Sequence, residues 1–209
     1  MKRPSNTDAS SSPASERGRP RGFDIDEVTQ AAGRIFWEQG YHATSIETLC
    51  QSTGLFRGSL YSAFGDKHGL LVAAFSQYAE GAVARLKERL SAEGSPQETL
   101  REALLHYTRV AAKLSERHGC FITNAAIEML PADETVRSHV EATLHRIATQ
   151  LAAAVVRGQQ AGEFNPSLDE QAVSTYLLCM IQGLRVLGKV NTREQDLVAV
   201  VDLTLRALV

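Results

Sequence analysis

From Phe23 onward, apolar residues recur at intervals of three and four positions, and no segment alternates apolar and polar residues as a strand does. A period near 3.6 residues is typical of amphipathic α-helices that bury one face. The pattern predicts an all-α protein, with helices over residues 23–40, 45–53, 56–64, 67–90, 97–117, 121–130 and 133–161, then two more that begin near Ser167 and Thr192.

Capping boxes indicate where three of these helices begin. In a capping box, a Ser or Thr and a Glu or Gln three residues later each accept the other's backbone N–H. The pattern occurs at residues 44–47, 167–170 and 192–195. We therefore expect Thr44, Ser167 and Thr192 to cap the helices that follow them.

Residues 45–64 predict two short helices joined by a turn at Gly54, a residue that tolerates the left-handed conformation at a helix end. In the second helix, Phe56, Leu60 and Phe64 recur at i, i+4 and i+8, so we expect them to share a buried face. This arrangement is a helix-turn-helix, whose second helix enters the major groove of DNA.

Polar residues on the opposite face could contact DNA. Arg57 can donate a fork of hydrogen bonds to guanine or phosphate, and Gly58 lets the backbone approach closely. Lys67 begins the next helix, where free amides also favour phosphate, and Arg21 could enter the minor groove. The candidate DNA-binding residues are Arg21, Thr44, Ser45, Arg57, Gly58, Ser59, Tyr61, Ser62 and Lys67.

The stretch from about Asp24 to Leu71 resembles the N-terminal domain of the TetR family of bacterial transcriptional repressors. The motifs that carry the resemblance are Gly40-Tyr41, Thr44-Ser45-Ile46, Thr53-Gly54-Leu55, Arg57-Gly58-Ser59-Leu60-Tyr61, Phe64-Gly65-Asp66-Lys67 and Leu70-Leu71. Two positions depart from the family pattern: Phe56 replaces a small hydroxyl residue that could cap, and His68 stands where an acid is frequent. The resemblance implies a ligand-controlled dimeric repressor that binds a pseudo-palindromic operator.

Charge and composition refine this picture. The net charge is −2, and acidic and basic residues balance over 1–70, so DNA affinity must come from individually placed cations. No apolar run is long enough for a membrane span or a signal segment, so we expect a cytoplasmic protein without membrane contact. We expect a disordered, basic Ser/Pro-rich arm over 1–21, the DNA-binding domain over 22–82 and a ligand-binding and dimerisation domain over 83–209.

The last two helices are apolar on more sides than a single subunit easily covers. A four-helix bundle across a two-fold axis would bury them, as in the family that the chain resembles. We therefore expect a homodimer rather than a monomer whose last helix completes its own core. The candidate interface residues are Val173, Tyr176, Leu177, Met180, Leu184, Leu187, Leu197 and Val201.

By resemblance, the middle helices hold a pocket for a small-molecule effector, although the same residue types are also common in cores. Asn124 is notable because an amide in an apolar helix needs a hydrogen-bond partner. The candidate ligand-binding residues are Phe75, Tyr78, Tyr107, Cys120, Phe121, Asn124, Met129 and Met180.

Other function classes find little support. The chain has no Gly-rich phosphate loop, nucleophile elbow or HExxH motif, and its histidines and cysteines match no standard ligand spacing. We therefore expect no enzyme activity, cofactor or metal site. Cys120 follows His118-Gly119 at a predicted helix start, a setting that favours the reactive thiolate. Two alternatives remain: a repressor that senses oxidants or electrophiles through Cys120, and an all-helical interaction protein that does not bind DNA.

Overall fold

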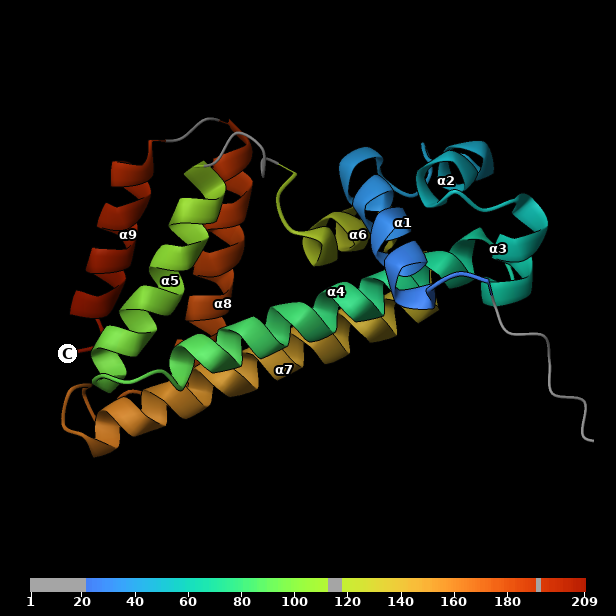
Figure 1. Cartoon of the computed structure of the whole chain (residues 1–209). Helices are drawn as coiled ribbons and strands as arrows, with labels where there is room; N and C mark the ends of the chain where they lie inside the picture. The colour runs from blue at the N-terminus through green and yellow to red at the C-terminus, as the bar shows by residue number, and fades with distance from the viewer. Residues whose placement is uncertain (1–21, 113–117, 191–192) are drawn as a thin grey trace, which may run out of the picture.

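The computed structural model describes residues 22–112, 118–190 and 193–209, and within them all regular secondary structure is helical (Figure 1), which confirms the predicted fold class. None of the helices described there is long and apolar enough to cross a membrane. The elements are α1 (Ile25–Gln39), α2 (Ile46–Thr53), α3 (Arg57–Phe64), α4 (Lys67–Leu90), α5 (Pro96–Ala112), α6 (Phe121–Met129), α7 (Glu134–Gln160), α8 (Glu170–Leu187), η2 (Gly188–Val190) and α9 (Glu194–Arg206).

Two long helices, α4 and α7, run side by side along the molecule (Figure 1). Helices α1, α2 and α3 gather where α4 begins, and we call this group the head. Helices α5, α8 and α9 gather at the other end, and with α7 they form the body. The short helix α6 lies beside α1, against α4 and α7, so it touches both parts.

The head closes around the first turns of α4. Its helices are amphipathic, and each presents an apolar face to the same small core. Gly33 of α1 lets α1 and α4 approach closely, since a Cβ at Gly33 would lie 3.3 Å from the Cβ of Ala74 on α4. The buried residues of this core are Val28, Ala32, Phe36, Leu49, Leu60, Leu70, Leu71 and Ala74.

The body core lies between the second half of α4 and helices α5, α7, α8 and α9. Each of these helices contributes leucine, isoleucine or valine at helical spacing, so its apolar face is covered by several neighbours at once. Fully buried members include Leu86, Leu100, Leu104, Leu151, Leu177 and Leu184.

The predicted capping boxes are each wrong by one or two residues. The N-cap of α2 is Ser45, whose hydroxyl accepts the Thr48 N–H at 3.0 Å, while Thr44 is buried. The N-cap of α8 is Asp169. The N-cap of α9 is Arg193, which makes no side-chain capping bond, and Thr192 lies outside the described residues. In each case the motif lies near the helix start, but a neighbouring residue takes the extended conformation of the cap.

We expect Gly158→Ala to destabilise the protein. A Cβ at Gly158 of α7 would lie 2.1 Å from Cδ2 of Phe164, a buried ring. Overpacking of this kind costs about 1–3 kcal/mol, measurable as a lower free energy of unfolding in urea. Gly58→Ala is the matched control, because nothing lies within 4 Å of its Cβ position, and it should stabilise by about 0.5–1 kcal/mol. Equal stabilities of the two variants would contradict this packing.

Candidate nucleic-acid interface and ligand cavity

The α2–α3 unit has the geometry of a helix-turn-helix. Helix α2 ends at Gly54, whose φ of 69° lies in the left-handed region, and the chain turns through Leu55 into α3. Leu49 and Leu60 are buried, so the two helices pack on each other and on the head core. The angle between them is therefore fixed by packing, and the other face of α3 is left to solvent.

The exposed face of α3 carries an ordered pair of side chains. Arg57 donates from Nε to the Tyr61 hydroxyl at 3.2 Å, and its guanidinium lies 5.2 Å from the centre of the Tyr61 ring. Gly58 and Ser62 are exposed beside them, and Ser59 is half-buried. The contact leaves Arg57 with further donors in its fork, and it limits the conformations of both side chains before any partner binds.

Phe56 does not belong to the buried stripe that the sequence predicted. It is the N-cap of α3, with extended backbone and no side-chain capping bond, and 86% of its surface is exposed. Because it precedes the first helical residue, its side chain does not follow the helical period of Leu60 and Phe64. The structure thus adds an exposed aromatic ring to the start of α3, which sequence reasoning missed.

The remaining candidates for DNA contact have different positions. Thr44 is only 1% exposed and its hydroxyl donates to the Gly40 carbonyl at 2.6 Å, so its inclusion as a DNA contact is wrong. Ser45 is exposed at the start of α2. The Lys67 ammonium sits 4.4 Å from the centre of the Tyr41 ring, and burial lowers the pKa of Lys67. Arg21 lies outside the described residues.

Two polar contacts join the head to the start of the body. The Glu128 carboxylate on α6 accepts the backbone N–H groups of Tyr41 and His42 at 2.9 and 2.7 Å. His68 of α4 lies 2.7 Å from Asp133, the N-cap of α7. The backbone N–H of α7 and His68 together lower the pKa of Asp133. These contacts fix the loop after α1 and the start of α4 against α6 and α7.

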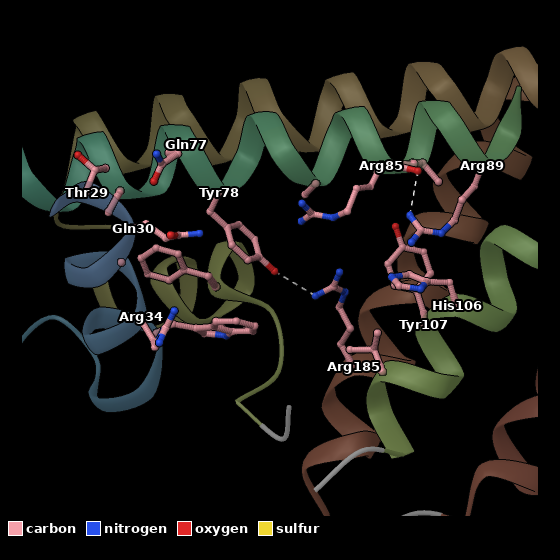
Figure 2. A pocket seen from close by; sticks show the side chains of 17 residues that line it. Thr29, Gln30, Arg34, Gln77, Tyr78, Arg85, Arg89, His106, Tyr107 and Arg185 are labelled. Carbon is pink, nitrogen blue, oxygen red and sulfur yellow. Dashed lines mark hydrogen bonds between the residues drawn. The ribbon is translucent and has the colours of Figure 1, made fainter. Parts of the chain in front are cut away.

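A cavity of about 570 Å³ lies between the head and the body (Figure 2). Its volume falls within the range of about 300–1,000 Å³ that is usual for small-molecule sites. It is lined from α1, α4, α5, α6 and α8. The lining residues are Thr29, Gln30, Gly33, Arg34, Trp37, Ala74, Gln77, Tyr78, Ala82, Arg85, Leu86, Arg89, His106, Tyr107, Val110, Phe121 and Arg185.

The polar groups of the cavity centre on Arg185 of α8. It donates to the Tyr78 hydroxyl at 3.3 Å, and its guanidinium lies 4.9 Å from the centre of the Tyr107 ring. Figure 2 shows Arg85 of α4 reaching into the same space. Burial raises the pKa of Tyr78 and Tyr107, so both hydroxyls remain protonated at neutral pH and can donate to a ligand.

His106 is a neutral side chain in this positive environment. Burial, and after it the charges of Arg89, Arg185, Arg109 and Arg85, together lower the pKa of His106 from 6.5 to about 4. At neutral pH the imidazole is therefore uncharged and offers both a donor and an acceptor.

Three of the eight residues expected at the ligand pocket line this cavity, namely Tyr78, Tyr107 and Phe121. The other five do not. Phe75, Cys120 and Met129 are buried in the core, and Met180 packs against it. Asn124 donates from Nδ2 to the His118 carbonyl at 2.7 Å, and its Oδ1 accepts from Lys189 Nζ at 3.0 Å. It lines a separate, smaller pocket.

Sequence reasoning missed the cationic part of the lining. One signal was present: Arg185 interrupts the otherwise apolar face formed by Met180, Ile181 and Leu184 on α8. An arginine on an otherwise apolar helix face is rarely buried unless another group pairs with its charge. Arg85 and Arg89, four residues apart, resemble an ordinary solvated helix face, and no sequence pattern connects them to α8.

Most residues expected at a dimer interface are already covered within one subunit. Five of the eight are buried by the chain's own helices, so they form no surface for a partner: Val173, Leu177, Leu184, Leu197 and Val201. Helix α9 packs on α5, and α8 packs on α5 and α7, which accounts for this burial. Tyr176 and Leu187 are exposed and Met180 is half-buried.

Cys120 is in a poor position for a sensor thiol. It is the N-cap of α6, as its place at a helix start suggested, but only 4% of its surface is exposed. An oxidant or electrophile has to reach the sulfur, so this burial argues against sensing through Cys120. Cys179 is exposed and Cys50 half-buried. Among the residues that the structure describes, no three His, Cys, Asp or Glu side chains gather as around a metal ion.

Comparisons with known proteins match both halves of the chain. The model of bacterial regulatory proteins of the tetR family matches residues 28–74, and that of the tetracyclin repressor-like C-terminal domain matches residues 96–202. The uncharacterized HTH-type transcriptional regulator YezE of Bacillus subtilis is 31% identical over 91% of this chain and 99% of its own length. The HTH-type transcriptional repressor ComR of Escherichia coli is 27% identical over 96% of each chain.

A solved structure also superposes along nearly the whole chain. It is a cysteine mutant of the TetR family transcriptional regulator CifR, complexed with 26-base-pair operator DNA. The TM-score is 0.80 at 29% identity, covering 90% of this chain and 99% of that chain.

We expect an NMR titration of the His106 imidazole to give a pKa of about 4. Since the unfolded chain binds this proton first, the contribution of His106 to stability should be present above pH 6.5 and lost as the pH falls toward 4. Arg89→Gln should raise the pKa of His106, because it removes the cation that lowers this pKa most. Arg146→Gln on α7 is the control and should leave it unchanged. A pKa near 6.5 in the unaltered protein would disprove this environment.

Proposed function

Because the chain belongs to the TetR family of bacterial transcriptional regulators, we propose that it binds an operator as a homodimer and represses transcription until a small-molecule ligand releases it. DNA binding is the shared activity of the family, and the relative ComR is named a repressor. The observation that carries the proposal is the exposed, donor-bearing face of α3 on a helix-turn-helix.

We propose that α3 lies in the major groove and contacts the base edges. Arg57 would donate to guanine or a phosphate, and Gly58 would allow the backbone to approach the base edges. Phe56, exposed at the start of the same helix, offers an apolar surface for the methyl group of thymine. Ser45 at the start of α2 and Lys67 at the start of α4 would meet phosphates on either side.

We propose that the dimer forms through the outward face of α8 and α9. Exposed apolar side chains remain on it after the subunit core is complete: Tyr176, Val186, Val200 and Leu203. Two such faces related by a two-fold axis would give a four-helix bundle and present two recognition helices to DNA. Half-sites about one DNA turn apart, or 34–36 Å, would suit such a pair.

The switch would act through α4. This helix runs unbroken from Lys67 to Leu90, so a division of the chain into domains at residues 82 and 83 falls inside it. A ligand in the cavity touches α1, α4 and α8 together and would shift the head relative to the body. A full reversal of the two states requires the ligand to prefer one by about 5.5 kcal/mol.

Operator binding is tested by selecting genomic fragments with the purified protein and measuring affinity for the best fragment. The Arg57→Ala/Tyr61→Ala double variant should bind it at least about 100-fold more weakly, because each well-placed contact contributes about 1–3 kcal/mol. Arg146→Ala, which removes an exposed cation from α7, should bind normally. Equal, sequence-independent binding by all three proteins would refute the proposal.

The dimer face is tested by sedimentation. Leu203 on α9 is 62% exposed. The substitution Leu203→Asp would place two carboxylates, one from each subunit, in the apolar interface, so we expect this variant to sediment as a monomer. Ile127→Asp places the same change on an exposed apolar residue of α6 and should remain dimeric. If Leu203→Asp sediments as the unaltered protein does, the interface lies elsewhere.

A further inference from the structure

Four arginines from three helices line the cavity between head and body. Arg34 comes from α1, Arg85 and Arg89 from α4, and Arg185 from α8. None of the described lining residues is an aspartate or a glutamate, and none of the four arginines forms a salt bridge with a carboxylate of the described residues. The cavity therefore carries a concentrated positive charge that no carboxylate in the described part of the chain neutralises.

The contacts that the arginines do make are with neutral groups. Arg185 contacts the Tyr78 hydroxyl and the face of Tyr107, and Arg89 donates to the backbone carbonyl of Arg85 at 2.9 Å. The guanidinium of Arg85 folds along α4 over Gly81, where a Cβ would lie 2.8 Å from its Nη1. These three guanidinium groups therefore keep donors that remain available for a negatively charged oxygen.

Aromatic side chains form the other part of the wall. Tyr78 packs edge to face on Trp37 and on Phe121, with ring centres 5.5 and 5.6 Å apart. The indole Nε1 of Trp37 is buried without a hydrogen-bond partner among the described residues. These flat, apolar surfaces lie within the same cavity as the arginines, so one ligand can meet both (Figure 2).

We propose that this cavity binds a small organic anion, with a carboxylate or phosphate group between Arg85 and Arg185 and a planar apolar body against Trp37, Tyr78 and Phe121. The inference deepens the proposed function and rests on it, since it gives the chemical class of the effector. Arginine matches the planar geometry of carboxylate and phosphate oxygens, and the apolar walls exclude water around the ion pair.

The position of the charges also explains how such an anion would be sensed. Arg34 belongs to the head, Arg185 belongs to the body, and α4 connects the two. Without an anion, the guanidinium groups of Arg85 and Arg185 repel one another; an anion between them attracts both, while the planar body of the ligand lies against Trp37 of α1. Binding would thus change the preferred distance between α1 and α8, which is the coordinate that sets the position of the head.

The proposal is tested by calorimetric titration of the full-length protein with three probes that share a naphthalene ring. The probes are 2-naphthoate, 2-naphthyl phosphate and the neutral 2-naphthamide. We expect at least one anion to bind roughly tenfold or more tightly than the amide, since charge-assisted hydrogen bonds are lost with the charge. The two anions distinguish a carboxylate site from a phosphate site. Inorganic phosphate alone should bind more weakly than 2-naphthyl phosphate, because it leaves the aromatic walls uncovered.

The arginines are tested by Arg85→Gln and Arg185→Gln, each of which should weaken anion binding roughly tenfold and leave the affinity for 2-naphthamide unchanged. Arg85→Lys retains the charge and should lose less. Arg146→Gln carries the same change of net charge outside the cavity and should bind as the unaltered protein does. Thermal unfolding of each variant establishes that it is folded.

A second readout does not depend on folding of a variant. An anion among the arginines offsets the charges that hold the pKa of His106 low, so saturating 2-naphthoate or 2-naphthyl phosphate should raise that pKa in an NMR titration. Binding of the amide as tightly as either anion, no effect of the arginine variants, or no binding of either anion at millimolar concentration would overturn the proposal.

Operator affinity measured in parallel separates this proposal from the function on which it rests. If the anions bind through the arginines while the protein selects no DNA sequence, the anion site stands and the repressor is refuted. If the protein binds its operator and the anions do not bind, the repressor stands and the anion site is refuted.

Discussion

The burial of one helix, α4, by two different sets of partners joins the head to the body. Its first turns place Leu70 and Leu71 in the core of the head, and its last turns place Leu86 and Leu90 in the core of the body. Packed interiors deform little, so under the proposed switch α4 would pass a displacement of one end to the other rather than absorb it. The recognition helix α3 packs on α4, and its position therefore depends on how α4 is held.

The polar contacts around α4 limit where the head can move. Glu128 holds the loop after α1, and the His68–Asp133 pair holds the start of α4 against α7. Both lie on the α6–α7 side, whereas the cavity separates α1 from α5 and α8. The head is thus anchored along one side and faces the cavity on the other.

Several positive charges around one cavity repel one another, which costs free energy. Exposure of some of these arginines to solvent reduces that cost. Arg34 and Arg85 are exposed and stay hydrated, while Arg185 is more enclosed and relies on Tyr78 and Tyr107. A set of like charges around a hollow does not stabilise the fold, so its presence is better explained by what the cavity receives. Burial, together with the charges of Arg89, Arg185, Arg109 and Arg85, holds the pKa of His106 low, so the electrostatics of the site can be followed by measuring that pKa.

The sequence by itself determined the all-α class, the order of the helices and the helix-turn-helix, because periodicity, Gly54 and the motif from Arg57 to Tyr61 are local. It located helix starts only to within two residues, since several neighbouring residues near Thr44 or Ser167 can cap. Only the tertiary structure decided what covers each apolar face: it buried Leu177 and Val201 within the subunit and exposed Phe56. It alone brought Arg34, Arg85 and Arg185 to one cavity, because helical spacing orients a side chain on its own helix but does not specify which distant helix it will meet.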